Sequence, residues 1–360
     1  AVFRGLPTGE TTLLDAAWTI DNNLAASAAQ IRWTGAGDLS GDGAADLLVE
    51  RTLEGGGAEA VLLTSPFDDV GSLGESSTRL TFPAGAEALT WAVVGDVTGD
   101  GTGDVLAGDP VFTDFAEESG KVWVFSGPLV GFREESSFYA VIRSTGAREG
   151  IGGALAAADV DGDGIGDAVL GATVEHVYVL AGPLVGAPIV QQDWSALWTY
   201  DPEELLDSSV FTGPVWTGDA TGDGHADLLF GSQDLRLVEG PLEGELSEAD
   251  VVAMLPGGTQ FSVGDVDADG LADLLTGDPT YDPGVSAREG LANLYYGPMS
   301  GTLEGPHATF TASAPQDELG TAVALGDGDG DGRDDLAIGV PGLDAQGLNR
   351  GAVLLFAAQE

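Results

Sequence analysis

The chain contains no cysteine, which excludes disulfide bridges and thiolate metal sites but identifies no cellular compartment. Bases are also scarce: Lys and Arg number 12 against 59 Asp and Glu, Lys121 is the only lysine, and the formal net charge is −47. A surface this acidic repels nucleic acids and anionic lipids, so we exclude both as partners.

Long hydrophobic runs are missing as well. No apolar stretch approaches the roughly 18 residues of a membrane-spanning helix, so we expect no direct membrane insertion. The sequence does not open with a basic, apolar segment, so any export signal is expected to have been removed or to lie outside it. Hydrophobic residues make up 43% of the 360 positions and are spread along the chain, which predicts a folded protein rather than a disordered one.

Catalytic signatures are scarce too. The three histidines, His176, His225 and His307, stand at unrelated positions, which favours structural roles over a catalytic triad. The sequence has no nucleophile elbow, HExxH motif or phosphate-binding loop. We therefore expect a protein that is not an enzyme.

What the chain has in abundance is aspartate and glycine, concentrated in nine-residue loops such as "DVDGDGIGD". Six loops of this type begin at Asp38, Asp96, Asp159, Asp219, Asp265 and Asp327. Carboxylates so close together repel one another unless a cation or hydrogen bonds compensate. Because the loops recur about every 60 residues, the sequence predicts a repeat protein. We expect one domain, residues 1–360, built from six repeats.

Each loop lies between short apolar segments, for example "GALAAA" (153–158) before it and "AVLGA" (168–172) after it. A third segment, "VYVLAGPL" (177–184), and a fourth, "SALWTY" (195–200), follow. Short β-rich runs bounded by Gly, Pro, Asp and Ser are typical of strands, and no stretch sustains a helical period. The repeat is therefore a four-stranded antiparallel meander of strands A to D, with the acidic loop between A and B.

The predicted fold class is all-β: a β-propeller of four-stranded blades, because repeats of this size with two apolar faces bury them against each other. A linear β-solenoid is the alternative, but its repeats are usually far shorter. The last repeat ends in a C strand (351–358), and a D-like segment (12–20) stands near the start, so we expect these two to pair and close the ring. Six blades are favoured, and the surplus strand-like segment at the start leaves seven open.

The loops are predicted calcium sites. Oxygen donors without histidine or cysteine favour Ca²⁺ over Mg²⁺, and up to six ions are expected. Position 7 varies freely, as it would if only its backbone carbonyl binds, and glycine at position 6 permits the sharp turn. At positions 1, 3, 5, 7 and 9 the loops place Asp38, Ser40, Asp42, Ala44 and Asp46; Asp96, Thr98, Asp100, Thr102 and Asp104; Asp159, Asp161, Asp163, Ile165 and Asp167; Asp219, Thr221, Asp223, His225 and Asp227; Asp265, Asp267, Asp269, Leu271 and Asp273; and Asp327, Asp329, Asp331, Arg333 and Asp335.

Three other kinds of acidic loop fit these residues less well. An EF-hand requires glutamate at position 12 and flanking helices, and the loops have neither. Tandem nonapeptide calcium rolls repeat far more often than these loops do. Metal-free Asx turns, in which the aspartates cap their own backbone, are the remaining alternative. If calcium binds, aspartate at position 3 should make the loops from Asp159, Asp265 and Asp327 the tighter sites.

Residues 319–356 add further features to their loop: a glycine before the first strand, a Gly-Val-Pro after the second, and "GAVLLF" as the third. In these features the chain resembles the FG-GAP repeats of integrin α-subunit β-propellers and their bacterial relatives. The resemblance covers essentially the whole chain and implies the propeller fold, bound calcium and an adhesive role.

The chain also departs from that family. The Phe-Gly signature appears as Ile151-Gly152 and Leu319-Gly320, and Gly-Ala-Pro appears as Gly-Asp-Pro at 108–110 and 277–279. All six repeats keep the loop, and cysteine is absent. We therefore carry over neither an integrin β partner nor a known ligand, and expect a bacterial secreted or cell-surface protein.

The predicted function is an extracellular, calcium-binding, non-enzymatic module for adhesion or protein binding, alone or within a larger surface protein. A glycan-binding lectin is the first alternative, because seven tryptophans could stack on sugars, although their repeat positions also suit packing between blades. A calcium-dependent polysaccharide lyase or phospholipase-type hydrolase is the second.

The protein or glycan ligand is expected on the face opposite the calcium loops. Successive loops of a meander alternate between faces, so the calcium loops should share theirs with short C–D turns, while long B–C and D–A loops gather on the other. Variable loops on a rigid scaffold commonly bind partners, and aromatic and arginine side chains dominate such interfaces. The candidate ligand-binding residues are Phe112, Phe115, Arg148, Tyr281 and Arg288.

Overall fold

The computed structural model describes residues 31–44, 46–53, 57–64, 78–83, 89–172, 176–200, 215–231, 234–282, 288–302, 305–312, 314, 316–327, 331–343 and 351–358. The chain divides into two compact units. The described part of the first lies within Thr12–Trp216 and Leu242–Ser247, and that of the second within Thr217–Pro241 and Glu248–Glu360. None of the helices in these residues has the length and apolar character needed to cross a membrane.

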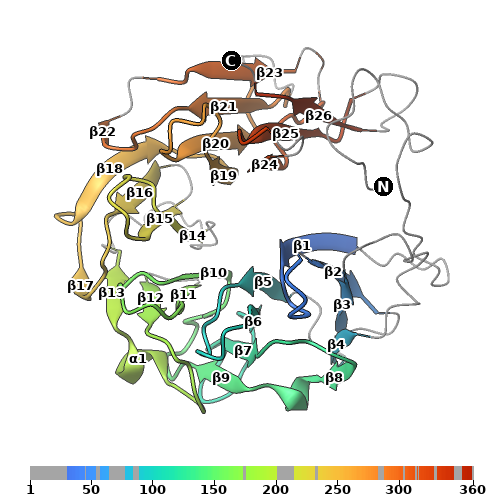
Figure 1. Cartoon of the computed structure of the whole chain (residues 1–360), viewed down its shortest axis with the longest axis vertical. Helices are drawn as coiled ribbons and strands as arrows, with labels where there is room; N and C mark the ends of the chain where they lie inside the picture. Colours follow the sequence, from blue (N-terminus) through green and yellow to red (C-terminus); the bar gives the residue numbers. More distant parts are fainter. Residues whose placement is uncertain are drawn as a thin grey trace. The chain divides into compact units, whose positions relative to one another are not determined.

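The first unit contains three blades, each an antiparallel meander in chain order (Figure 1). Blade 1 is β1 (Ile31–Gly37), β2 (Asp46–Thr52), β3 (Ala58–Leu63) and β4 (Arg79–Phe82). Blade 2 is β5 (Thr90–Val94), β6 (Asp104–Asp109), β7 (Lys121–Phe125) and β9 (Ala140–Arg143). Blade 3 is β10 (Ala154–Ala158), β11 (Asp167–Gly171), β12 (His176–Leu180) and β13 (Ala196–Thr199).

The second unit repeats the pattern. Blade 4 is β14 (Val215–Gly218), which begins at the boundary between the units, β15 (Asp227–Gly231), β16 (Asp234–Val238) and β18 (Val251–Pro256). Blade 5 is β19 (Gln260–Gly264), β20 (Asp273–Asp278), β21 (Leu291–Tyr295) and β23 (Ala308–Thr311). Blade 6 has β24 (Val323–Gly326), β25 (Asp335–Val340) and β26 (Ala352–Phe356) among the described residues. Six small meanders of this kind confirm the predicted all-β, β-propeller fold class.

The C–D connections differ from the prediction of short turns, which was wrong. The C–D connection of one blade runs parallel to the D strand of the blade before it, as β8 (Phe132–Glu134) with β4, β17 (Gly244–Leu246) with β13 and β22 (Gly301–Thr302) with β18. In blade 3 the connection carries helix α1 (Val190–Asp193) and reaches β9 through isolated bridges. These additions cover the outer edges of β4, β9, β13 and β18, which would otherwise offer unpaired backbone groups. Two or three residues are too few to show a strand pattern in the sequence.

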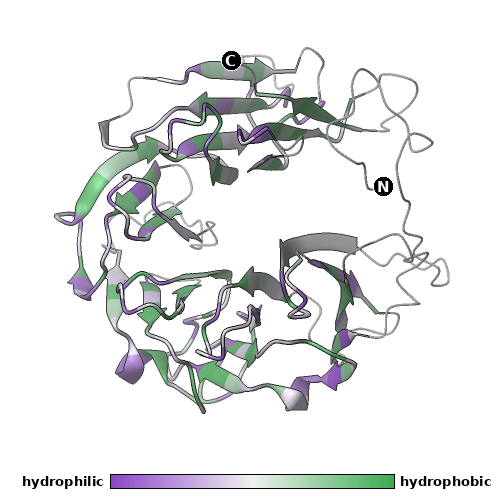
Figure 2. Ribbon diagram, viewed as in Figure 1, coloured by the Kyte–Doolittle hydropathy of each residue, from purple (hydrophilic) through white to green (hydrophobic). Residues whose placement is uncertain are grey.

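The core lies between neighbouring blades. Strands β6, β11 and β15 are buried at every position, as expected for a sheet covered on both faces. Figure 2 shows green, hydrophobic stretches in strands of both units. Phe82 of blade 1 contacts Trp91 and Trp123 of blade 2 edge-on, with ring centroids 5.3 and 5.0 Å apart. These tryptophans therefore serve packing between blades, as their repeat positions suggested.

The predicted ring closure involves residues 12–20, which lie outside the described residues. Its partner segment forms β26, which pairs with β25 and exposes Val353, Leu355 and Phe356.

Candidate functional site

The acidic loops connect strands A and B and share one hydrogen-bonding scheme. The carboxylate at position 1 accepts bonds from backbone N–H groups further along the loop: Asp159 accepts from Gly162 and Gly164, both at 2.8 Å. The loop curls around this side chain with φ +82° at Gly162 and +92° at Gly164, a left-handed backbone that favours glycine. The requirement at position 4, met by glycine in four of the five loops whose position 4 is described and by Ala268 (φ 58°) in the fifth, was not recognised in the sequence.

The position-5 aspartates accept a hydrogen bond within the loop and also face solvent. Asp163 Oδ1 accepts the N–H of Ile165 at 2.8 Å, and the other five loops repeat this bond from position 7 to position 5. In the second loop, Asp100 also accepts the Ser126 hydroxyl at 2.6 Å, and this bond lowers its pKa. All six position-5 carboxylates are solvent-exposed.

The position-9 aspartates are buried instead. Asp167 is 0% exposed, and its Oδ2 accepts the N–H groups of Val160 and Asp161 at 2.9 and 3.1 Å. Its Oδ1 accepts the N–H of Gly182, the glycine of the Gly-Pro turn after strand C, at 2.9 Å. Burial raises the pKa of Asp167, and likewise of Asp104, to about 6, because loss of water disfavours the charged form. A cation nearby would favour the ionised carboxylates.

The Gly-Pro turns fit the loops closely. A Cβ on Gly182 would stand 2.5 Å from the carbonyl of Gly166, at position 8 of the loop, and one on Gly297 would stand 2.6 Å from that of Ala272. The sequence showed Gly-Pro only as the end of a strand, whereas the structure shows that glycine allows the turn to reach the position-9 carboxylate.

The neighbouring blade also holds each loop. The leucine after Gly-Pro donates its N–H to the position-2 carbonyl of the preceding loop: Leu129 to Leu39 at 2.7 Å, and Leu184 to Val97 at 2.8 Å. Both leucines and both acceptor residues are buried. The loops are thus part of the contact between blades.

The donor atoms converge most clearly in two loops. One oxygen each from Asp159, Asp161 and Asp167 lie within 4.8 Å of one another, and so do oxygens of Asp265, Asp267 and Asp269. Asp329, at position 3 of the last loop, lies outside the described residues.

The hydroxyl groups at position 3 test independently whether the loops fit a metal ion. Ser40 Oγ and Thr221 Oγ1 are buried and make no hydrogen bond in the described structure. Buried hydroxyls without a partner are uncommon and call for one. Their place in an all-oxygen donor set suits a hard cation such as Ca²⁺.

The predicted ligand-binding residues occur as two groups, one in each unit. In the first unit, Phe112 packs edge-on against Trp123, with centroids 5.6 Å apart, and lies under Lys121 Nζ at 4.4 Å. Phe115 is 55% exposed, with the Arg143 guanidinium 5.5 Å from its ring. Phe112 therefore belongs to the packing of its loop, and Phe115 to the surface.

The arginines are exposed and pair with glutamates. Arg148 lies 3.7 Å from Glu117, and Arg288 lies 3.7 Å from Glu318. In the second unit Tyr281 is 39% exposed and occupies the loop position of Phe112. Gly290 N–H donates to Tyr281 as Gly120 N–H does to Phe112. Parallel bridges from Gly120 to Ile151 and from Gly290 to Leu319 join each B–C loop to the next D–A connection.

Two histidines have structural contacts. His176 Nδ1 and the Tyr178 hydroxyl both lie 2.7 Å from Glu149 Oε1, and burial together with Glu149 raises the pKa of Tyr178. His307 stacks on Tyr296, with centroids 4.7 Å apart, and accepts the N–H of that residue at 2.9 Å. Neither contact contains a serine, threonine or cysteine side chain.

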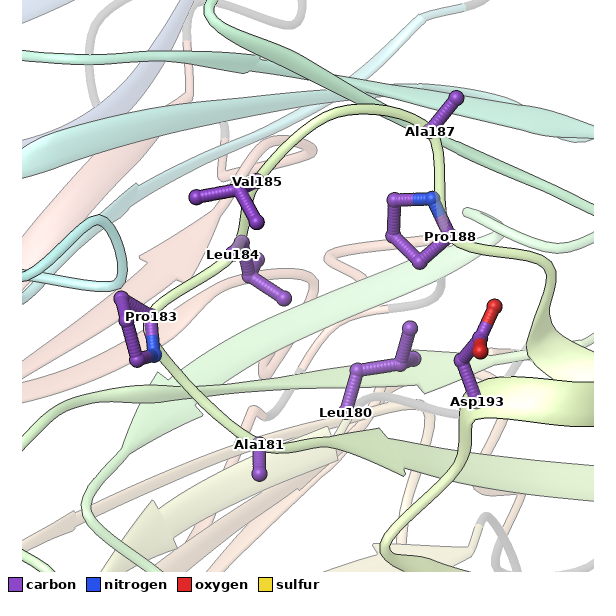
Figure 3. Close-up of a pocket in the computed structure, with 8 residues that line it drawn as sticks. All are labelled: Leu180, Ala181, Pro183, Leu184, Val185, Ala187, Pro188 and Asp193. Carbon is purple, nitrogen blue, oxygen red and sulfur yellow. The ribbon is translucent and has the colours of Figure 1, made fainter.

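A pocket of about 370 Å³ lies in the C–D connection of blade 3 (Figure 3). Apolar side chains, among them Leu180, Leu184 and Val185, line it together with the carboxylate of Asp193, which accepts the Ile189 N–H at 2.7 Å. One carboxylate is the only ionisable group in this lining, so the pocket does not bring together a paired acid and base.

Residues 319–356, which carry the family features in the sequence, match the family model of the FG-GAP repeat. Residues 319–356 thus form an FG-GAP repeat, and the β-propeller fold of the chain is consistent with integrin α-like FG-GAP repeats.

Two curated relatives are named phosphatidylinositol-glycan-specific phospholipase D. The protein from Rattus norvegicus is 36% identical over 100 residues, which cover 28% of this chain and 12% of that protein. The protein from Mus musculus is 29% identical over 164 residues, which cover 39% of this chain and 19% of that protein. The matched region is therefore less than a fifth of either relative.

Among solved structures, Raptor from Chaetomium thermophilum is similar with a TM-score of 0.50 and 9% identity. The similarity covers 92% of this chain and 24% of that chain. At this identity the likeness shows the fold alone.

Proposed function

We propose that this chain, an FG-GAP-containing β-propeller, is an extracellular calcium-binding module that binds another protein and catalyses no reaction. The observation that carries the calcium proposal is the pair of buried position-3 hydroxyls without partners, Ser40 Oγ and Thr221 Oγ1, inside loops of otherwise acidic oxygen donors. A bound Ca²⁺ would offset the repulsion among the carboxylates and satisfy these hydroxyls.

Residues of the loops themselves would hold the ion. The position-1 and position-5 aspartates present oxygens while their N–H bonds fix the loop, and the position-9 aspartate anchors it to the core. Such a site strengthens the contact between blades, because the loop is held by both. Weak sites of this kind require the millimolar calcium found outside cells, which supports an extracellular location.

Thermal unfolding tests the calcium proposal. Addition of EGTA should lower the melting temperature and calcium should restore it, since one site at a hundredfold excess over its Kd stabilises by about 2.7 kcal/mol. Magnesium at the same ionic strength is the control and should restore less. Identical melting curves in EGTA and calcium would refute calcium binding.

Each unit is proposed to offer its B–C and D–A loops to a partner, with Phe115 and Arg148 as contacts in the first unit and Tyr281 and Arg288 in the second. Exposed aromatic and arginine side chains on loops held by a rigid sheet support this assignment. Capture of surface proteins by the wild-type chain, lost on alanine substitution of these four residues at unchanged melting temperature, is the expected result.

The alternatives have direct tests. A hydrolase is one alternative, because the two relatives are named as phospholipases. If this chain is not an enzyme, its incubation with phosphatidylinositol-glycan substrates should release no product above background. A glycan array separates a lectin from a protein-binding module. Saturable binding of one glycan class, lost on substitution of the exposed loop aromatics, would favour the lectin.

A further inference from the structure

The side chain at position 7, which varies freely between loops, lies against the preceding loop. The loops are numbered 1 to 6 in chain order. Ile165 Cδ1 of loop 3 would be 3.9 Å from a Cβ on Gly99, at position 4 of loop 2. Leu271 of loop 5 lies closer still to the same position of loop 4, at Gly222. Position 7 therefore contributes to the surroundings of the neighbouring loop as well as packing on the Gly-Pro turn of its own blade.

In loop 6 this residue is charged. The Arg333 guanidinium donates through Nη1 to the carbonyl of Asp267, at position 3 of loop 5. The next residue fixes the approach: Asp334 donates its N–H to the Asp265 carbonyl at 2.8 Å, and its Oδ2 accepts the Asp265 N–H at 2.9 Å. Gly264 makes room for that carboxylate, since a Cβ there would collide with it. Loop 6 thus brings one arginine to loop 5 in a fixed register.

We propose that Arg333 is a tethered cation that weakens calcium binding at loop 5, an inference that rests on the calcium-binding function proposed above. The guanidinium lies beside the loop in which oxygens of Asp265, Asp267 and Asp269 converge. It offsets part of their mutual repulsion before any metal arrives, and it repels an entering dication. Both effects lower the free energy gained when calcium binds at loop 5. Loop 5, which ligand charge alone ranks among the tighter sites, is therefore a weaker one.

A reciprocal exchange of side chains tests this. Arg333→Leu gives loop 5 the apolar neighbour that loop 4 has, and Leu271→Arg gives loop 4 the charged neighbour that loop 5 has. From the size of charge interactions near a protein surface, we expect a change of about three- to tenfold in one calcium dissociation constant, tighter in R333L and weaker in L271R. Calcium titration calorimetry measures the constants, and anomalous scattering from terbium soaked at graded concentrations assigns each to its loop.

Two controls isolate the effect. In an Asp269→Ala background, which removes a ligand from loop 5, R333L should no longer alter calcium binding. Arg236→Leu removes the same charge from β16, where the guanidinium pairs with Glu248 rather than with an acidic loop, and should leave all constants unchanged.

The possible results are distinguishable. Unchanged or weaker calcium binding at loop 5 in R333L would overturn the inference. If R333L does not fold, an unchanged calcium dissociation constant at loop 4 in L271R would overturn it instead. A wild-type chain that binds no calcium would instead remove the proposed function and this inference together. Calcium binding in the wild type with no effect of either exchange refutes the tethered cation alone.

Discussion

Within one loop, identical aspartates have different tasks. Asp167 at position 9 is buried and accepts three backbone N–H groups from two segments of the chain, whereas Asp163 at position 5 is exposed and accepts one. The first task is structural even without metal. The second leaves the outer oxygen of the carboxylate available to a cation.

Alanine substitutions should separate these tasks. Asp167→Ala leaves three N–H groups without acceptors, one buried and two partly buried, and should reduce the free energy of unfolding by at least about 2 kcal/mol, in EGTA as well as in calcium. Asp163→Ala exposes one N–H to water and should cost less than about 1 kcal/mol in EGTA, while removing part of the calcium-dependent stabilisation. Urea unfolding in each buffer measures both. Equal losses in EGTA would show that the two aspartates share one role.

The acidic positions are predictable from the sequence because repetition makes their spacing visible. The spacing does not show that the position-9 aspartate is buried and the position-5 aspartate exposed. The burial at position 9 depends on the Gly-Pro turn, which packs on the loop from a later part of the chain. Position 7 looks unconstrained in the sequence because its contacts lie in distant segments: Leu271 packs on Gly297 of its own Gly-Pro turn and on Gly222 of the neighbouring blade.

At the scale of the element, the Gly-Pro turn is what joins a loop to its own C strand. Gly182→Ala should reduce the free energy of unfolding by about 2–4 kcal/mol, because the new Cβ would stand 2.5 Å from the Gly166 carbonyl and force the backbone apart. Gly95→Ala is the matched control, since nothing lies within 4 Å of a Cβ there, and it should change stability by no more than about 0.5 kcal/mol. Chemical denaturation of both variants gives the comparison. A tolerated G182A would mean that the turn yields at little cost.

The B–C loop of blade 2 divides its aromatic residues between packing and surface. Phe112→Ala removes the contacts with Trp123 and Lys121 and should cost about 1–3 kcal/mol of stability. Phe115→Ala, at a side chain 55% exposed, should change stability by less than about 1 kcal/mol. Thermal melts distinguish the two, and the reverse order would place Phe115 in the core. Binding experiments should therefore rely on Phe115.

Strand positions were predictable because short apolar runs between glycine, proline and aspartate follow from burial on both faces, as in β11. The parallel additions were not. Strand β8 is three residues long with two of them exposed, so neither length nor alternation marks it.

At the scale of the whole molecule, repetition predicted the fold, because a blade-sized unit with two apolar faces is stable only against another copy. Phe82 of blade 1 shows this packing, because it contacts both Trp91 and Trp123 of blade 2. The pairing of residues 12–20 with β26 stays a prediction, as does the face that binds a partner, because both depend on how distant parts of the chain meet.

The net charge of −47 makes stability depend on salt. In EGTA, raising NaCl from about 20 mM to about 500 mM shortens the screening length from about 20 Å to about 4 Å and should raise the melting temperature, because repulsion within the folded chain is reduced. In saturating calcium the same salt series should produce a smaller rise, since the loops, where carboxylates are closest together, are already neutralised. Melting curves across the NaCl series in both buffers measure the difference, with a neutral osmolyte as the control for effects other than screening. A melting temperature in EGTA that does not rise with salt would contradict electrostatic repulsion as the cost that calcium relieves, and a salt response unaltered by calcium would place that repulsion outside the loops.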